Sequence, residues 1–263
     1  MAGAAYTFRP WEIPVRRLIA AAAALAALAL PASAGAIING QPDGQQHPNV
    51  GGLLSGAPLF SGSWTYCSGT LISPTVLLTA AHCGASGTRV AVTFDEAYQP
   101  GGRRYFGTFY AHPDFNQSQD DPRDIAVVRL DQAPAGVQPA RIVQEGALAH
   151  LPMPQPLRAV GYGAYETRMG AGGPVQLYDD VRRQAVSVVN AVTPSWLRAS
   201  MNAAKGDGGT CFGDSGGPNF LAGTDVVAAI TITGDTVCRA TNVSYRLDKP
   251  QARAFLAAFV ALP

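Results

Sequence analysis

Short apolar stretches separated by turn residues run along most of the chain. β-branched residues dominate several of these stretches, which is typical of strands. The pattern predicts strands at Thr70–Ile72, Val76–Ala80, Val90–Phe94, Ile125–Leu130, Leu157–Gly161, Ala185–Val189 and Val226–Thr233. Because helical patterns do not alternate with these stretches, the order favours an all-β fold of barrels or sandwiches over βαβ units.

Helical patterns are predicted at two places only. The first is the C-terminal end, where Asp248 is expected to cap a helix and Pro250 suits its first turn. The apolar face of this helix would consist of Phe255, Leu256 and Phe259. A shorter helix is expected to begin near Thr193–Ser195.

The first 36 residues have the order of a secretory signal. Arginines precede an apolar run, Leu18–Leu30, and small residues follow up to Ala36, as in an Ala-x-Ala cleavage site. We expect a signal peptide over 1–36, with cleavage after Ala34 as the alternative, and a mature domain over 37–263. The apolar run is too short to span a bilayer comfortably, so we expect a secreted, extracellular protein without stable membrane anchoring.

Composition narrows the possible functions. The chain has 263 residues, of which 47% are hydrophobic and 14% charged, which is enough apolar material for a sizeable core. The formal net charge is only +1. No strong field therefore draws the protein to nucleic acid, and no nucleic-acid partner is expected.

Four cysteines, Cys67, Cys83, Cys211 and Cys238, fit an oxidising compartment. Four cysteines allow three pairings. The local pairing, Cys67 with Cys83 and Cys211 with Cys238, would close two short loops. A zinc site is the alternative, but no two of these cysteines have the close spacing that such sites use. No metal and no cofactor are expected, and Asp95–Glu96 alone is too weak a signal for calcium.

The sharpest chemical signal is the segment Gly213–Pro218, which reads GDSGGP. A serine flanked by glycines can lie on a tight turn, with its hydroxyl exposed and nearby N–H groups free to face an oxyanion. The segment also matches the nucleophile elbow of α/β-hydrolases. That fold needs its histidine after the serine, whereas all four histidines precede Ser215. A structural serine in a glycine turn remains the plain alternative.

Two further segments carry a candidate base and its partner. His82 follows an apolar strand and is adjacent to a cysteine, which would hold the ring in the fixed orientation that a general base needs. Asp124 opens the apolar strand that ends at Leu130, where a buried carboxylate could orient an imidazole. Asp114, Asp120 and Asp121 are rivals by composition, but none of them opens such a strand.

Three segments, Thr79–Cys83, Asp124–Leu130 and Gly213–Pro218, closely resemble the catalytic motifs of the chymotrypsin/trypsin-like serine proteases, in that family's order, and the chain looks like a secreted member of the bacterial type. Further matches are Cys67–Ser73, which implies the Cys67–Cys83 bridge, Val160–Gly163, and Ile37–Gly40 as the mature N-terminus. The resemblance runs from about residue 37 to the end. It implies two six-stranded antiparallel β-barrels and an active site in the cleft between them.

The resemblance implies a serine endopeptidase that forms an acyl-enzyme on Ser215. His82 would be general base and acid, and Asp124 would orient it. The N–H groups of Gly213 and Ser215 would form the oxyanion hole. A free amine at Ile37 would pair with Asp214 and shape that hole.

In this family the residue six positions before the serine lies at the base of the primary substrate pocket. Here it is Gly209, followed by Thr210, so cleavage after Lys or Arg is not implied. Ile232, Thr233 and Gly234 replace the usual Ser-Trp-Gly on the pocket wall. We expect a neutral pocket for apolar or aromatic side chains, with altered hydrogen bonding around Asp124.

Expected partners are protein or peptide substrates and protein protease inhibitors, and the protein is expected to be a monomer. Three other functions compete with this interpretation: a catalytically silent protease-like binding protein, an esterase or lipase on another fold, and a plain secreted β-domain. The first would lack a triad residue in the usual case, and none is missing here. The histidine order disfavours the second.

Overall fold

The structure, a computed structural model, describes residues 1–3, 37–117 and 120–263. Contacts divide the chain into two units, Met1–Ser33 and Ala34–Pro263. Residues 4–36, which contain most of the predicted signal peptide and end at its expected cleavage site, lie outside the described residues. Within the described part of the chain, no helix is long and apolar enough to cross a membrane.

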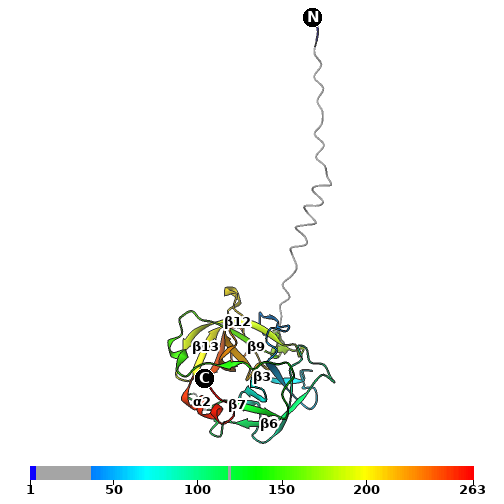
Figure 1. The fold of residues 1–263 in the computed structure, drawn as a ribbon. Helices are drawn as coiled ribbons and strands as arrows, with labels where there is room; N and C mark the ends of the chain where they lie inside the picture. The colour runs from blue at the N-terminus through cyan, green and yellow to red at the C-terminus, as the bar shows by residue number, and fades with distance from the viewer. Residues whose placement is uncertain (4–36, 118–119) are drawn as a thin grey trace. The chain divides into compact units, whose positions relative to one another are not determined.

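Six strands of the first half close into an antiparallel barrel in the order β2-β3-β4-β7-β6-β5 (Figure 1). Successive side chains of a strand point to opposite faces, so every second side chain faces the barrel interior. In β6, for example, Tyr105 and Phe109 are buried while Phe106 is exposed. The strands are β2 (Val50–Leu54), β3 (Thr65–Ser73), β4 (Val76–Thr79), β5 (Arg89–Thr93), β6 (Tyr105–Ala111) and β7 (Ala126–Leu130).

The second half forms another closed ring of six antiparallel strands, because β9 pairs with both β12 and β14. Two short strands, β1 (Gln41–Pro42) and β8 (Arg141–Ile142), add to this sheet. The six strands are β9 (Pro156–Gly161), β12 (Arg183–Val192), β13 (Trp196–Ser200), β14 (Pro218–Leu221), β15 (Val226–Gly234) and β16 (Thr241–Arg246).

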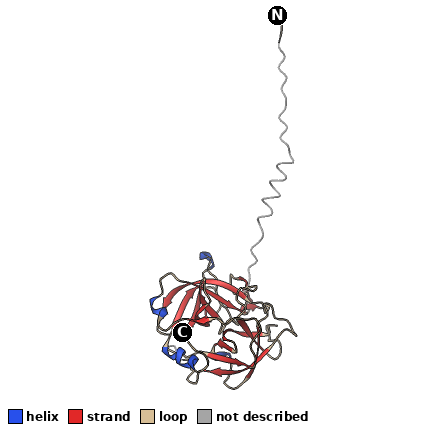
Figure 2. Ribbon diagram, in the orientation of Figure 1, coloured by secondary structure: helices blue, strands red, loops and turns tan. Residues whose placement is uncertain are grey.

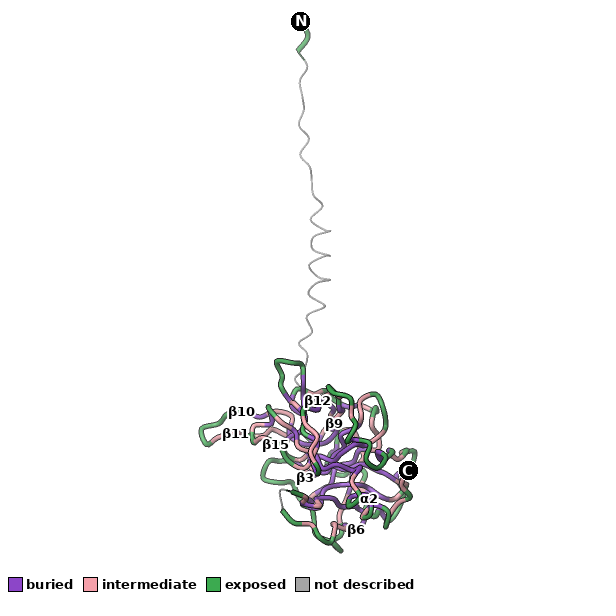
Figure 3. The backbone as a smooth tube through the Cα atoms, turned by 90° about the vertical axis from the view of Figure 1, so that its left-hand side faces the viewer, coloured by how far each residue is buried: buried purple, intermediate pink, exposed green. Residues whose placement is uncertain are grey.

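The remaining elements lie outside the barrels. A separate hairpin of β10 (Glu166–Gly170) and β11 (Gly173–Leu177) projects from the second half, and nearly all of its residues are exposed or half-buried (Figure 3). The described helical segments are few and short (Figure 2). They are the C-terminal helix α2 (Pro250–Ala257) and the 3-10 turns η1 (Ala81–Cys83), η2 (Ala147–His150) and η3 (Ala203–Lys205).

All seven predicted strands are confirmed, and so is the C-terminal helix with Pro250 in its first turn. The predicted cap is wrong: Lys249 is the N-cap residue and no side chain caps the helix. The carboxylate of Asp248 instead accepts the N–H of Leu148, at 3.0 Å, and pairs with Arg246. It is therefore engaged with the protein interior rather than with the helix end.

The short helix predicted near residues 193–195 is also wrong. These residues form the connection between β12 and β13, and Thr193 Oγ1 accepts the N–H of Trp196 at 3.2 Å. A threonine hydroxyl that bonds to nearby backbone stabilises a turn as readily as a helix start, and here the adjoining strands decide between the two.

Both local disulfides are present, Cys67–Cys83 and Cys211–Cys238. The zinc alternative is therefore wrong, because the four sulfurs form two disulfide bonds and none is available as a thiolate ligand.

The buried guanidinium of Arg182 joins three parts of the chain. It pairs with Asp43, and both side chains are completely inaccessible to solvent. Burial opposes the charge on Asp43, but hydrogen bonds from His47 and Arg182 outweigh it and hold the pKa of this carboxyl below its usual value. The other acceptors of Arg182 are the carbonyls of Gly44, Val50 and Phe94 and the hydroxyl of Tyr162, at 2.8–3.2 Å.

A second buried carboxylate, that of Asp180, ties the second half of the chain to the start of β3. It accepts hydrogen bonds from the Ser63 hydroxyl at 2.6 Å and the Trp64 N–H at 2.8 Å. Thr65 adds its N–H at 2.9 Å and its hydroxyl at 2.7 Å. Four donors compensate the cost of burying this charge and fix how β3 enters the first barrel.

Replacing Arg182 by alanine should lower the free energy of unfolding by about 3–5 kcal/mol, because Asp43 would stay buried without its ion-pair partner. Urea unfolding followed by tryptophan fluorescence measures this change. The matched control is Arg168→Ala, which removes an exposed arginine that pairs with Glu166. The control should leave the urea midpoint nearly unchanged. Equal losses in the two variants would contradict the role given to Arg182.

Candidate active site

His82 is held at the end of β4 by its neighbours. The chain leaves β4 through the 3-10 turn η1, in which Ala81 and Cys83 are buried and Cys83 is bonded to Cys67 on β3. The side chain of His82 is 32% exposed. The histidine backbone is thus anchored on both sides, while its ring remains open to solvent.

Asp124 contacts His82 through both carboxylate oxygens. Oδ2 lies 2.7 Å from the ring Nδ1, and Oδ1 accepts the backbone N–H of His82 at 3.0 Å. The contact follows from sheet register, because Thr79 on β4 pairs with Ala126 on β7. Asp124 is only 4% exposed. With Nδ1 directed at Asp124, Nε2 is the ring nitrogen left to exchange a proton.

The loop that carries Ser215 packs directly on the strand end before His82. Gly216 has a φ of +78°, and a Cβ at this position would lie 2.1 Å from Thr79 Oγ1 and 2.6 Å from the nitrogen of Ala80. Only glycine fits this approach. His82 and Ser215 consequently line the same two cavities.

Gly213 and Ser215 both present unengaged N–H groups. Gly213 has a φ of +93°, and its carbonyl accepts the hydroxyl of Ser68 at 3.0 Å. The Ser215 carbonyl accepts the N–H of Ser68 at 2.8 Å. Within the described residues, the N–H groups of Gly213 and Ser215 donate to no protein acceptor. Such donors are available to an oxyanion.

Asp214 lies completely buried between two glycines. Its carboxylate accepts the N–H of Gly163 and the N–H of Cys211, each at 2.8 Å. A Cβ at Gly163 would come within 2.6 Å of its Cγ, and one at Gly161 within 2.2 Å of its Oδ1. Burial raises the pKa of Asp214 to about 7, although both hydrogen bonds oppose that rise. No cation among the described residues pairs with it.

The segment from Ile37 docks against the second barrel. Ile37 is fully buried against Ala159 and Ala185, and Ile38 pairs with Gly209, whose N–H donates to the Ile38 carbonyl at 3.0 Å. In this chain Ile37 is an internal residue without a free amine. Its pairing with Asp214 therefore stays a prediction.

Four of the five predicted pocket residues, Thr210, Ile232, Thr233 and Gly234, line a cavity of about 230 Å³ next to Ser215. The fifth, Gly209, is buried and is not part of the lining. The full lining consists of His82, Thr210, Cys211, Phe212, Ser215, Thr231, Ile232, Thr233, Gly234, Asp235 and Cys238.

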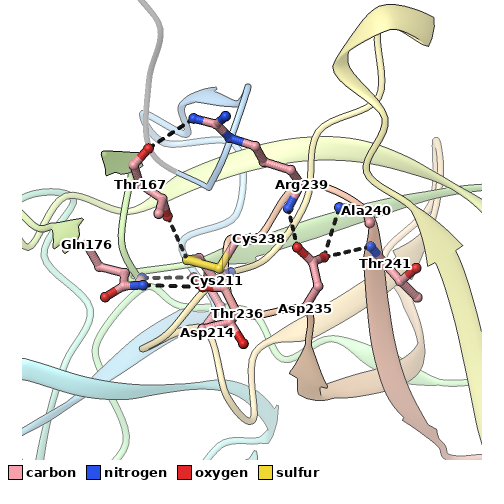
Figure 4. The surroundings of a disulfide bond; sticks show 11 residues. Thr167, Gln176, Cys211, Asp214, Asp235, Thr236, Cys238, Arg239, Ala240 and Thr241 are labelled. Carbon is pink, nitrogen blue, oxygen red and sulfur yellow. Dashed lines mark hydrogen bonds between the residues drawn. A yellow bond between two sulfur atoms is a disulfide. The ribbon is translucent and has the colours of Figure 1, made fainter. Parts of the chain in front are cut away.

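Sequence reasoning missed Asp235, which lines this cavity and lies close to the Cys211–Cys238 disulfide (Figure 4). Its carboxylate accepts three backbone N–H groups, those of Arg239, Ala240 and Thr241, at 2.8–2.9 Å. Burial works against the charge, but these bonds outweigh it and lower the pKa of Asp235. The carboxylate thereby closes the loop that carries Cys238. An aspartate at a strand end before a turn was the available signal.

Asp121, a rival of Asp124 by sequence, has a different role. It accepts the hydroxyl of Tyr245 at 2.9 Å and pairs with Lys249 at 3.1 Å. Burial opposes the charge on Asp121, but the hydrogen bonds from these two partners lower the pKa of its carboxyl. The bonds tie the loop before β7 to the second half of the chain. Ile232, which lies near Asp124 across another cavity, has no hydrogen-bond donor to offer that carboxylate.

The sulfurs of Cys67 and Cys83 and a ring nitrogen of His82 lie within 4.8 Å of one another. The two sulfurs form a disulfide, and metals bind the thiolate form of cysteine. This cluster does not therefore offer a metal site, and its bond instead fixes the backbone beside His82.

The comparisons agree with this geometry. The family model described as Trypsin matches residues 41–249. Kallikrein-2 from Homo sapiens is 28% identical over 68% of this chain and 74% of its own length. Alkaline trypsins C and A from Manduca sexta are 32% and 31% identical, over 76% and 85% of this chain and 82% and 91% of their own lengths.

A solved structure titled HL collagenase superposes with a TM-score of 0.62, covering 82% of this chain and 95% of its own. At 18% identity this likeness shows the fold alone. The three relatives named above are animal proteins, and they give no support to the bacterial type expected from the sequence. The family match and the trypsin relatives together show that this chain belongs to the Trypsin family of serine endopeptidases.

Proposed function

We propose that the protein hydrolyses peptide bonds through an acyl-enzyme formed on Ser215. The observation that carries this proposal is the two-point contact of Asp124 with His82, in a site where His82 and Ser215 line the same cavities. As a protease of this family, the protein acts on protein or peptide substrates.

The proposed reaction begins when Ser215 Oγ attacks the substrate carbonyl carbon while His82 Nε2 takes its proton. Asp124 holds the Nδ1–H and stabilises the imidazolium. The negative oxygen of the tetrahedral intermediate accepts hydrogen bonds from the N–H groups of Gly213 and Ser215. His82 then gives its proton to the leaving amine. Water, activated by His82 in the same way, releases the acyl group and restores Ser215.

We further propose that the protein is secreted after removal of a signal peptide over 1–36 and acts as a monomer, with protein protease inhibitors as further partners. Two disulfides support an oxidising compartment. Removal of the signal peptide after residue 36 would free the amine of Ile37. That amine would pair with Asp214, which is buried and has no cation partner among the described residues.

Diisopropyl fluorophosphate should add one mass adduct to the mature protein, located on Ser215. Intact and peptide mass spectrometry measures the adduct, with Ser215→Ala as the unlabelled control. No adduct on folded protein with a free Ile37 would contradict the proposal and favour a catalytically silent binding protein. Labelled protein that cleaves esters but no peptides would favour an esterase.

Asp124→Asn should lower kcat by roughly 10⁴-fold, because an amide favours the wrong histidine tautomer. Steady-state kinetics on a peptide substrate measures this change. The control is Asp114→Asn, which alters an exposed rival aspartate that pairs with Arg123. Its kcat should stay near that of the unmodified protein. A similar loss in both variants would contradict the assignment.

A chain that keeps residues before Ile37 should lose stability as pH rises from about 4 to about 7. Over that window the unfolded carboxyl, with its usual pKa of 3.8, has ionised, while burial keeps the folded Asp214 protonated up to about 7. Thermal unfolding at several pH values measures this, and Asp214→Asn should flatten the dependence.

A chain beginning at Ile37 should lose this pH dependence and gain activity, because its amine would pair with the ionised carboxylate. N-terminal sequencing of secreted material identifies the natural start. A mature chain that begins at Gly35 yet is fully active would contradict this part of the proposal.

A further inference from the structure

Met201 lies behind the wall of the cavity next to Ser215. It directly follows β13, is fully buried, and belongs to a small apolar cluster. The other buried members of this cluster are Ile38, Ala164, Cys211 and Cys238. The disulfide of the cavity wall, Ile38 and Met201 therefore belong to one apolar cluster.

The side chain of Met201 fills the space that a side chain at Gly209 would need. A Cβ built on Gly209 would lie 2.2 Å from both Cγ and Sδ of Met201. At Gly234, the nearest methionine atom to such a Cβ is Cε, at 4.0 Å. Gly234 and Thr210 line the cavity, and Gly209 directly precedes Thr210. Met201 consequently lies between two parts of the chain that form the cavity wall.

The cavity offers no free charge to a substrate side chain. The carboxylate of Asp235, its one acidic lining group, is occupied by three backbone N–H groups of its own loop. Apart from His82, Ser215 and Gly234, the remaining lining consists of the disulfide, Ile232, Phe212 and three threonines. The length of an apolar substrate side chain, rather than its charge, is then the property that this cavity can discriminate.

We propose that Met201 determines the depth of this cavity and so the size of the substrate side chain that precedes the cleaved bond. With Met201 in place, the cavity favours short apolar side chains over aromatic ones. This inference rests on the proposed peptide hydrolysis at Ser215, and it narrows the apolar or aromatic preference expected from the sequence.

Peptide substrates that differ only in the residue before the cleaved bond test the proposal. We would compare kcat/KM for alanine, leucine and phenylalanine at that position. In Met201→Ala the ratio of phenylalanine to alanine kcat/KM should rise at least about tenfold, since one methylene in an apolar pocket is worth about 10-fold or more. The matched control is Met169→Ala on the exposed β10–β11 hairpin, which should leave the ratio unchanged.

Met201→Leu provides a second variant in case truncation of a buried side chain prevents folding. Leucine nearly conserves the volume of methionine but is shorter, so the variant should fold and shift the ratio in the same direction. Gly209→Ala adds a methyl group at the contact. It should reduce kcat/KM for phenylalanine, and Met201→Ala should restore it in the double variant.

Titration of each variant with diisopropyl fluorophosphate measures the fraction of molecules whose Ser215 is reactive. This fraction does not depend on the side chain of a peptide substrate. Absence of labelling in the unmodified mature protein would refute the proposed function itself. Full labelling of Met201→Ala or Met201→Leu with an unchanged phenylalanine-to-alanine ratio would overturn the role of Met201 and leave the proposed function standing.

Discussion

Arg182 is buried where the N-terminal segment meets both barrels, and its charge is stable there only because every nearby acceptor is in place. Asp43 comes from the N-terminal segment, Val50 and Phe94 from the first barrel, and Tyr162 from the second. A buried cation without these partners would cost several kcal/mol. The guanidinium therefore stabilises one relative placement of the two barrels. The candidate active site lies between the barrels and requires that same placement.

The geometry of the candidate active site depends strongly on how the two barrels are placed, because each half of the chain supplies different reacting groups. His82 and Asp124 come from the first barrel, where the pairing of β4 with β7 already brings them together. Ser215 comes from the second half, and its loop fits only because Gly216 lets it approach the end of β4. Asp180 and Asp121 add further ties across the boundary, and Asp121 comes from the loop that leads to Asp124.

Local patterns were enough to predict seven strands and the C-terminal helix, because each depends on residues near in sequence, but they did not predict β2, β6, β13, β14 or β16. The local disulfide pairing was one of three that the sequence allowed, and it is the one present. The residues of the candidate triad were identified because short motifs carry them. Arg182, Asp180 and Met201 were not found, since their partners lie far away along the chain and nothing in the flanking residues indicates which carbonyl or glycine they meet. Asp248 shows the same limit: a suitable cap by sequence, it is engaged by Leu148 and Arg246 instead.

The bond between Cys67 and Cys83 joins β3 to the turn that carries His82, directly beside the candidate base. Reduction of this one bond would remove the covalent tie between the turn and β3 and would leave the two contacts with Asp124 to orient His82. Cytosolic thiol systems keep cysteines reduced, whereas exported chains become oxidised. The fixed orientation of the candidate base would therefore depend on the redox state of the compartment that holds the chain.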